Sequence, residues 1–380
     1  MKFIYVILVG LWLLSSVASA AEKPKIAADS AILIEASGER VIFEKDADVR
    51  RYPASMTKIM TALLVLENDV MDKVTTISPT AAFTEDSSLG LQPNDNLTIA
   101  DLTRGLMLVS DNGTAVAIAE SIDGSVDAFA RRMNQKASAI GCSDTHFNNP
   151  NGLPDPAHYS TARDMAKICA YAMRREDFRE LVGSRYGVSH WLIPAGRWVE
   201  MENTNKLLAT YYGADGIKTG WTRAAGGCLA ASASRDGMRL IAVVMHSTDS
   251  DTRFDDAKKL LDYGFATVKM KHALSKERIR KNIWVENGKN FRVAVGAASD
   301  VIYPVFEGEK AKDFKISYEL PQFLSAPINV GDKIGQIAIK YHDKTVGTVD
   351  IIAKESVGEG FSFLSYFLVG LLTKLSALFA

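Results

Sequence analysis

Three short strings, in a fixed order along the sequence, contain the candidate catalytic residues. They are Ser55-Met56-Thr57-Lys58, Ser110-Asp111-Asn112 and Lys218-Thr219-Gly220. Each string alone is a weak signal, because a serine three residues before a lysine recurs by chance in a chain of this composition. The three together, in this order, indicate serine acyl transfer, in which a hydroxyl oxygen attacks a carbonyl carbon.

The first string pairs a nucleophile with a base. An alcohol is a poor nucleophile at neutral pH, and a helix that begins at Ser55 places Lys58 one turn later on the same face. Lys58 can accept the hydroxyl proton only when it is uncharged, so its pKa must lie well below the usual value of about 10.4. Burial and a second cation both lower a lysine pKa, and Lys218 is the candidate for that cation.

The other two strings offer a proton relay and substrate contacts. Ser110 can pass a proton between the lysines and a departing amine, and Asn112 can present its amide to a substrate backbone. Lys218 and Thr219 precede a predicted strand, and Gly220 permits a ligand to approach a strand edge closely. Read singly, the strings would be an N-cap, a turn and a glycine-rich loop.

The secondary structure predicted around these residues consists of hairpins and helices. Turn signals at Ser37-Gly38 and at Arg235-Asp236-Gly237 predict two hairpins, over 31–44 and 227–246. Apolar spacing and capping residues predict helices at 55–66, 99–108, 114–120 and 251–264, and a further helix that starts at 160–164. This pattern predicts an α/β (α+β) fold, with an antiparallel sheet flanked by helices and a helical subdomain.

Beyond a basic stretch at 269–281 the pattern becomes all β. Short alternating runs predict six strands, at 282–285, 291–295, 301–306, 314–320, 334–341 and 345–352. We therefore expect a catalytic domain over 21–268 and a small β-sandwich domain over 269–357.

Both ends of the sequence have the character of targeting segments. Residues 1–20 contain a lysine, an apolar core and a small-residue site at Ala18-Ser19-Ala20, which predicts a secretory signal peptide rather than a membrane span. Residues 361–380 are strongly apolar with a narrow polar stripe, which predicts an amphipathic helix, bounded at 358–380, that lies in a membrane interface. A core helix of the second domain and a full span are the alternatives.

The amino-acid composition argues against several classes of protein. The 380 residues include 47% hydrophobic and 23% charged side chains with a formal net charge of -1, so neither disorder nor a nucleic-acid partner is expected. Three cysteines are too few for a disulfide framework, and buried free thiols are the preferred interpretation of Cys169 and Cys228, with pairing of Cys142 left open. The six histidines show no metal-ligand spacing, so neither a metal nor a cofactor is expected.

On these strings, and on Tyr159-Ser160-Thr161-Ala162-Arg163-Asp164-Met165, the chain resembles the low-molecular-mass penicillin-binding proteins. These are membrane-anchored D-alanyl-D-alanine carboxypeptidases with a β-lactamase/transpeptidase-like fold. The resemblance covers nearly the whole mature chain. It implies that the penultimate D-alanine of a peptidoglycan stem peptide acylates Ser55, that terminal D-alanine leaves, and that water hydrolyses the acyl-enzyme.

The resemblance also implies the roles of individual residues. Lys58 would be the base, Ser110 the proton relay, and Asn112, Lys218, Thr219 and Gly220 substrate contacts. The backbone N–H groups of Ser55 and Trp221 would form the oxyanion hole, and Arg253 would help to hold the terminal carboxylate. The implied partners are stem peptides, β-lactams and, through the last helix, the membrane, at the periplasmic face of the inner membrane.

Three alternatives remain at this point. A class A β-lactamase shares the strings but uses a loop glutamate to activate the deacylating water, and no glutamate stands between Glu120 and Glu176. A D-Ala-meso-diaminopimelate endopeptidase normally lacks the second domain and the anchor. A non-catalytic peptidoglycan-binding protein would not need an intact nucleophile and base.

Overall fold

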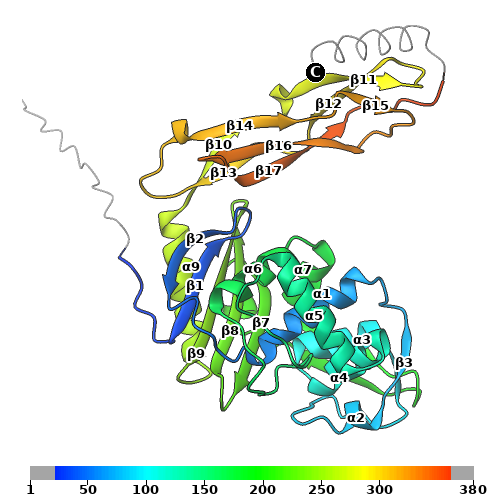
Figure 1. Ribbon diagram of the computed structural model, residues 1–380, viewed down its shortest axis with the longest axis vertical. Coiled ribbons are helices and arrows are strands. Elements are labelled where there is room, and N and C mark those ends of the chain that lie inside the picture. Colours follow the sequence, from blue (N-terminus) through cyan, green and yellow to red (C-terminus); the bar gives the residue numbers. More distant parts are fainter. Residues whose placement is uncertain (1–21, 361–380) are drawn as a thin grey trace, which may run out of the picture.

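A five-stranded antiparallel sheet lies at the centre of the first domain. The computed structural model describes residues 22–360, and in them the strand order of this sheet is β2-β1-β9-β8-β7 (Figure 1). Its strands are β1 (Ser30–Glu35), β2 (Arg40–Lys45), β7 (Ala214–Thr222), β8 (Gly226–Arg235) and β9 (Met238–Ser247). Both predicted hairpins are confirmed. The β8–β9 turn consists of Asp236 and Gly237, each with a positive φ, as a tight hairpin turn requires.

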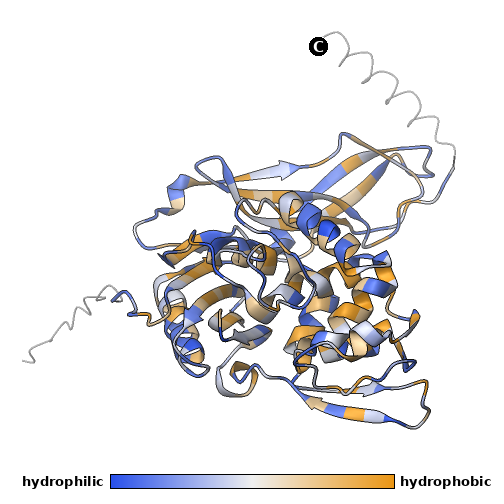
Figure 2. Ribbon diagram, turned by 60° about the horizontal axis from the view of Figure 1, so that its bottom comes forward, coloured by the Kyte–Doolittle hydropathy of each residue, from blue (hydrophilic) through white to orange (hydrophobic). Residues whose placement is uncertain are grey.

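Helices cover both faces of this sheet because its strands are apolar on both sides. In β9, Leu240 and Val244 pack in the core under α9 (Thr252–Thr267), whereas Ile241 and Val243 pack in the core under the other helices. Figure 2 shows the apolar residues (orange) on these strands and on the inward sides of the helices. The predicted layer architecture is confirmed.

The helices on the other face include a cluster that forms the helical subdomain. Their bounds are α1 (Lys58–Glu67), α2 (Pro79–Ala82), α3 (Ile99–Leu108), α4 (Asn112–Asp123), α5 (Val126–Ile140), α6 (Ala162–Ala172) and α7 (Glu176–Gly183). The short helix α8 (Leu207–Thr210) instead packs through Leu207 in the core under α9. The α3 bounds match the prediction. Two small two-stranded antiparallel sheets that the sequence did not reveal complete this region, β3 (Val74–Thr76) with β4 (Asn96–Thr98) and β5 (Tyr186–His190) with β6 (Trp198–Glu202).

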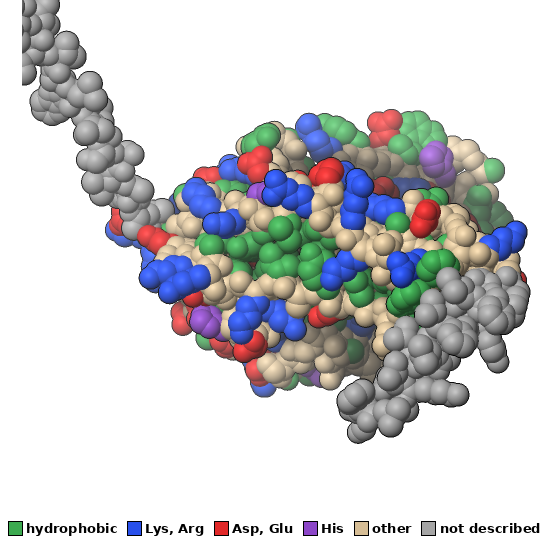
Figure 3. Space-filling view, turned by 90° about the horizontal axis from the view of Figure 1, so that it is seen from above, with side chains coloured by type: hydrophobic (Ala, Val, Ile, Leu, Met, Phe, Trp, Pro, Cys, Tyr) green, Lys and Arg blue, Asp and Glu red, His purple; other side chains and the backbone are tan. Residues whose placement is uncertain are grey.

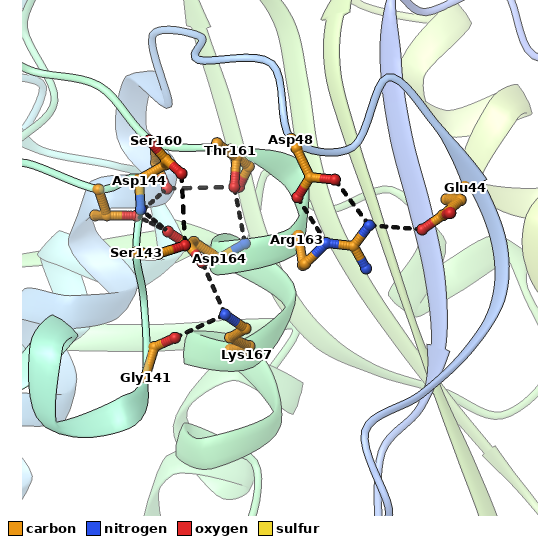
Figure 4. A network of polar contacts seen from close by, with 11 residues as sticks. Glu44, Asp48, Gly141, Ser143, Asp144, Ser160, Thr161, Arg163, Asp164 and Lys167 are labelled. Atoms are coloured by element: carbon orange, nitrogen blue, oxygen red, sulfur yellow. Dashed lines mark hydrogen bonds and ion pairs between the residues drawn. The ribbon is translucent and has the colours of Figure 1, made fainter.

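The start of α6 is fastened by a polar network (Figure 4). Thr161 is the N-cap and accepts a hydrogen bond from the Asp164 N–H at 3.0 Å. The buried Asp164 carboxylate does not complete a capping box but accepts the N–H of Asp144 at 2.8 Å. Arg163 pairs with Glu44 of β2 at 2.7 Å. The network thus holds Asp144 against the first turn of α6 and, through Arg163, holds that turn against the sheet.

The second domain is all β, as predicted. A six-stranded sheet of order β14-β16-β17-β12-β11-β15 and the pair β10–β13 enclose one apolar core. The strands are β10 (Lys269–Leu274), β11 (Arg280–Glu286), β12 (Arg292–Ala297), β13 (Val301–Val305), β14 (Phe314–Glu319), β15 (Phe323–Ser325), β16 (Lys333–Tyr341) and β17 (Lys344–Ala353), with 3₁₀ turns η2 (Lys276–Arg278) and η3 (Ala311–Asp313). Strands β10 and β15 were not predicted.

The tip of the β1–β2 hairpin joins the two domains. The Arg40 guanidinium forms an ion pair with Glu309 and lies 3.8 Å from the centroid of the Phe306 ring. The Ser37 hydroxyl donates to the Val346 carbonyl at 3.2 Å. The predicted hairpin therefore also serves as the contact with the β domain.

The predicted signal peptide and residues 361–380 of the predicted anchor lie outside the described residues. Residues 358–360, which the prediction included in the terminal helix, are instead extended, and Glu359 bridges Gly288. Within 22–360, no helix has both the length and the apolar character needed to cross a bilayer.

Candidate active site

Ser55 and Lys58 face each other across a single turn. The segment Ala54–Thr57 forms a 3₁₀ helix, η1, and α1 begins at Lys58 rather than at Ser55. With three residues per turn, a 3₁₀ helix aligns side chains three positions apart. The Lys58 Nζ atom accordingly lies 2.9 Å from the Ser55 Oγ atom.

The surroundings of Lys58 favour an uncharged amine. Its side chain is fully buried, and Nζ lies 2.6 Å from the Asn112 Oδ1 atom and 2.7 Å from the Asn151 carbonyl oxygen. Burial lowers the pKa of Lys58 well below its usual value, and the charge of Lys218 lowers it further, against the opposing effect of Asp111. A neutral amine has two N–H groups and one lone pair. Once the two carbonyl oxygens accept those N–H groups, the lone pair is left for the Ser55 hydroxyl to donate to.

Two glycines allow other segments to approach the backbone of Ser55. A Cβ atom on Gly152 would lie 1.9 Å from the Ala54 carbonyl oxygen, and a Cβ atom on Gly220 would lie 3.0 Å from the Ser55 nitrogen. Ala54 itself has a φ of 48°, a conformation that non-glycine residues rarely adopt and that is concentrated at functional sites. The nucleophile therefore sits on a strained turn between the loop that carries Gly152 and strand β7.

The second string connects α3 to α4. Asp111 is buried and caps α4, and its carboxylate also accepts the N–H groups of Ser88 and Leu89. This capping places Asn112 at the first turn of α4, two residues before the predicted start, with its Oδ1 atom toward Lys58. Ser110 has a φ of 63°. No hydrogen bond within the described residues joins Ser110 to Ser55, Lys58 or Lys218.

The loop 148–158 supplies the third partner of Lys58 and is itself held by a histidine. The buried His158 accepts the Asn148 N–H at Nδ1 at 3.0 Å, so its Nε2–H donates to the Thr57 hydroxyl at 2.8 Å. Burial lowers the pKa of His158 to about 4, which keeps the ring neutral. His158 thus fixes the loop to η1, and with it the Asn151 carbonyl beside Lys58.

The third string lies inside strand β7, not before a strand as the sequence suggested. The glycines around it resembled a turn, but β7 pairs with β8 along its whole length, including Gly220 with Cys228. Lys218 is buried, and burial together with the nearby Arg253 lowers its pKa to about 7. The Thr219 hydroxyl lies 2.6 Å from that of Thr204. β7 forms one edge of the sheet, so these residues border the turn that carries Ser55.

Arg253 reaches the third string from the first turn of α9. It is only 9% exposed, rather than a surface side chain, and its Nη1 atom donates to the Gly220 carbonyl at 2.6 Å. Trp221, by contrast, has a side chain that is 56% exposed. Arg253 is therefore part of the same assembly as Lys218 and Gly220.

Several partners were not identified from the sequence: the Asn151 carbonyl, His158 and Thr204. The run Pro150-Asn151-Gly152 is typical of a turn, but a turn signal does not reveal which distant residue its carbonyl groups will contact. His246 pairs with Asp29 at 2.7 Å. Cys169 and Cys228 are buried and free, as expected. Among residues 22–360, no cluster of three or more His, Cys, Asp or Glu side chains could hold a metal ion.

Comparison with protein families gives two matches. Residues 17–249 match the family model described as D-alanyl-D-alanine carboxypeptidase, and residues 268–359 match the one described as the C-terminal domain of penicillin-binding protein 5.

Individual relatives agree with these matches. The chain is 33% identical to the D-alanyl-D-alanine carboxypeptidase DacF of Bacillus subtilis, over 87% of this chain and 86% of that protein. It is 34% identical to DacA of Escherichia coli, over 89% and 85%. The structure resembles crystal structures of penicillin-binding protein 5 from Haemophilus influenzae, with a TM-score of 0.65, 32% identity, and coverage of 89% of this chain and all of that one.

Proposed function

The chain belongs to the D-alanyl-D-alanine carboxypeptidase family, and from this premise we propose that Ser55 carries the acyl group of its reaction. The protein is a serine-type D-alanyl-D-alanine carboxypeptidase, a hydrolase. Its substrate is the stem peptide of peptidoglycan, from which it removes the terminal D-alanine. The result is fewer donors for cross-linking.

In the acylation step, the Ser55 Oγ atom attacks the carbonyl carbon of the penultimate D-alanine while Lys58 Nζ takes the hydroxyl proton. The resulting oxyanion accepts hydrogen bonds from the Ser55 and Trp221 N–H groups. The first of these lies at the start of η1, where helical N–H groups lack intrahelical partners, and β7 passes within contact of it at Gly220. The C–N bond then breaks, and the amine of the terminal D-alanine receives the proton through Lys58 and Ser110.

Two cations and two hydrogen-bonding side chains position the substrate. Lys218 and Arg253 attract the terminal carboxylate, which is the group that distinguishes a carboxypeptidase substrate from an internal peptide bond. Thr219 and Asn112 bind the polar groups of the peptide, and Gly220 keeps the strand edge open to it.

In the deacylation step, water attacks the Ser55 ester and Lys58 takes its proton. The loop 148–158 contains no glutamate that could activate this water in the manner of a class A β-lactamase. A β-lactam would therefore acylate Ser55, and the resulting acyl-enzyme would be hydrolysed slowly. This is the behaviour expected of a penicillin-binding protein rather than of a β-lactamase.

We further propose that the enzyme acts at the periplasmic face of the inner membrane. Residues 1–20 would be removed on export, and the apolar stretch 361–380 would hold the protein at the bilayer. The sequence supports both assignments, and both segments lie outside the described residues.

The observation that carries this proposal is the buried Lys58 amine, 2.9 Å from Ser55 Oγ and bound by two carbonyl oxygens. The test is release of free D-alanine from a pentapeptide that ends in D-Ala-D-Ala, together with labelling by a fluorescent penicillin. We expect Ser55→Ala to lose both activities and Ser143→Ala, at an exposed serine, to keep both. D-alanine release at the native rate by folded Ser55→Ala would refute the proposal.

A further inference from the structure

The two domains differ in charge in a way that catalysis does not explain. Residues 22–268 carry 27 basic and 33 acidic side chains, whereas residues 269–360 carry 15 basic and 12 acidic ones. The excess is concentrated in 269–292, which contains eight basic and two acidic residues. No part of the active site lies in this segment.

In the folded protein, three cations of this segment and Lys354 line one pocket. Lys276, Arg280, Lys281 and Lys354 line a pocket of about 600 Å³ whose only acidic lining residue is Glu277. All four side chains belong to exposed residues. Within residues 22–360, none of the four forms an ion pair, although several exposed cations of the first domain do so. The Glu355 carboxylate accepts the N–H of the lining residue Ala294 at 2.8 Å, and the Asp300 carboxylate accepts the N–H of Lys276 at 2.9 Å. The four cations exceed the acidic side chains, so the pocket carries a net positive charge.

The face of the β11–β12 hairpin that carries Arg280 also carries apolar side chains. The register pairs Arg280 with Gly296, Asn282 with Ala294 and Trp284 with Arg292, and alternate residues of a strand share a face. The Arg292 guanidinium lies 4.3 Å from the centroid of the half-buried Trp284 ring. Figure 3, seen from the β-domain end, shows Lys and Arg side chains around a hydrophobic area.

The described chain ends beside this hairpin. The Gly360 N–H donates to the Asn287 carbonyl at 3.0 Å, and the Lys289 N–H donates to the Gly358 carbonyl at 3.0 Å. Asn287 and Lys289 belong to the turn between β11 and β12. The apolar residues 361–380, whose only charged side chain is Lys374, therefore start at the turn of the basic hairpin.

Lys281 alternates to the other face of β11, where its Nζ atom lies 3.9 Å from the centroid of the Tyr318 ring. We infer that the outer face of β11–β12, with Lys276, Arg280 and Lys354 of the pocket, binds the anionic headgroups of a phospholipid bilayer. This inference rests on the proposed location at a membrane. Cations near such a surface each strengthen binding about fivefold, and an aromatic ring beside them suits the interface. An acidic first domain is repelled by the same surface. Headgroup binding would thus orient the enzyme with its β domain toward the bilayer and its active-site domain away from it.

The test uses the full mature chain and its partition onto vesicles of phosphatidylcholine alone or with added phosphatidylglycerol. We expect tighter binding to the anionic vesicles at low salt and loss of that preference at high salt. The triple variant Lys276→Gln/Arg280→Gln/Lys354→Gln should lose at least about tenfold of the preference and keep its binding to neutral vesicles. The matched control Lys312→Gln/Lys315→Gln/Lys344→Gln, which changes exposed lysines near the Arg40 contact by the same charge, should keep the preference.

Equal binding of the wild type to both vesicle types would overturn the inference, as would an equal loss in the two triple variants. Binding of an acidic protein by this face, with no lipid preference, would overturn it as well. Binding to neutral vesicles measures the contribution of the proposed anchor at 361–380, and penicillin labelling measures the integrity of the proposed active site. Failure of either is therefore distinguishable from failure of the basic face.

Discussion

The Lys58 amine and the Asn151 carbonyl oxygen lie 2.7 Å apart although 93 residues separate them in the chain. This contact, together with that of Asn112 Oδ1, occupies both N–H groups of a neutral lysine. The lone pair is consequently directed at Ser55 without any motion of the base. The geometry therefore makes the charge state of one amine the main determinant of reactivity.

Replacing Lys58 by arginine tests its role as the base. A guanidinium is always charged and cannot accept the Ser55 proton, and removal of a general base costs about 10² to 10⁴ in rate. We expect Lys58→Arg and Lys58→Ala both to lower the rate constant of acylation by a fluorescent penicillin by at least about 10². The thermal unfolding of each variant is the control for folding. Native-rate acylation in either folded variant would exclude Lys58 as the base.

Replacing Asn112 by aspartate should move the pH profile of acylation. A carboxylate at the position of Oδ1, 2.6 Å from Nζ, stabilises the ammonium form and raises the pKa of Lys58. Since the base must be neutral, the acid limb of the rate profile should shift to higher pH by about one unit or more. An unshifted acid limb would show that another group limits the rate at low pH.

The alkaline limb of the pH–rate profile should reflect the loss of the proton from Lys218. Its pKa is lowered to about 7, mainly by burial, and it must be protonated to attract the substrate carboxylate. We expect kcat/KM for the pentapeptide to rise with pH as Lys58 loses its proton and to fall above about pH 7 as Lys218 loses its own. Lys218→Arg keeps the charge at all working pH values and should remove the alkaline limb alone. Persistence of that limb in Lys218→Arg would assign it to a different group.

Local signals were sufficient to predict most regular elements and the identities of the central residues. The hairpin turns at Ser37-Gly38 and Asp236-Gly237 and the helix Ile99–Leu108 follow from turn chemistry and apolar spacing, and the structure has all three. Ser55, Lys58 and Asn112 were identified because their types and order are distinctive.

The partners of those residues could not be predicted because long-range packing decides them. The Asn151 carbonyl and His158 contact Lys58 and Thr57 across 93 and 101 residues. Gly220 was expected just before a strand, yet it lies within β7, because the strand must pass against the Ser55 nitrogen. No periodicity in the sequence encodes either requirement.

Gly141 and Gly152 have nearly the same backbone conformation but different surroundings. Their alanine variants therefore distinguish the destabilisation caused by a positive φ from that caused by a clash of the added Cβ atom. Gly141 has a φ of 93°, and a Cβ atom added there would have no other atom within 4 Å, whereas at Gly152, with a φ of 90°, an added Cβ would meet the Ala54 carbonyl oxygen at 1.9 Å. Gly141→Ala should lower the free energy of unfolding by about 1 kcal/mol and leave acylation unchanged. Gly152→Ala should cost about 2 to 4 kcal/mol and slow acylation at least about tenfold, because the loop must move away from Lys58.

Denaturant unfolding and penicillin labelling of the two variants check this comparison. Equal effects of Gly141→Ala and Gly152→Ala would mean that the close approach of the loop to Ala54 is unimportant.

His158 should make stability depend on pH in the mildly acidic range. The folded protein lowers its pKa from 6.5 to about 4, mainly by burial, so between these values the unfolded chain binds the proton and the folded chain does not. Protonation at Nδ1 would also break the hydrogen bond from Asn148. The contribution is fully present above pH 6.5 and is lost as the pH falls toward 4, and it amounts to about 3 kcal/mol. The free energy of unfolding of the wild type should therefore fall more steeply over this range than that of His158→Gln. His190→Gln, at an exposed histidine of β5, should retain the wild-type slope, and parallel slopes for wild type and His158→Gln would assign the acid sensitivity to other groups.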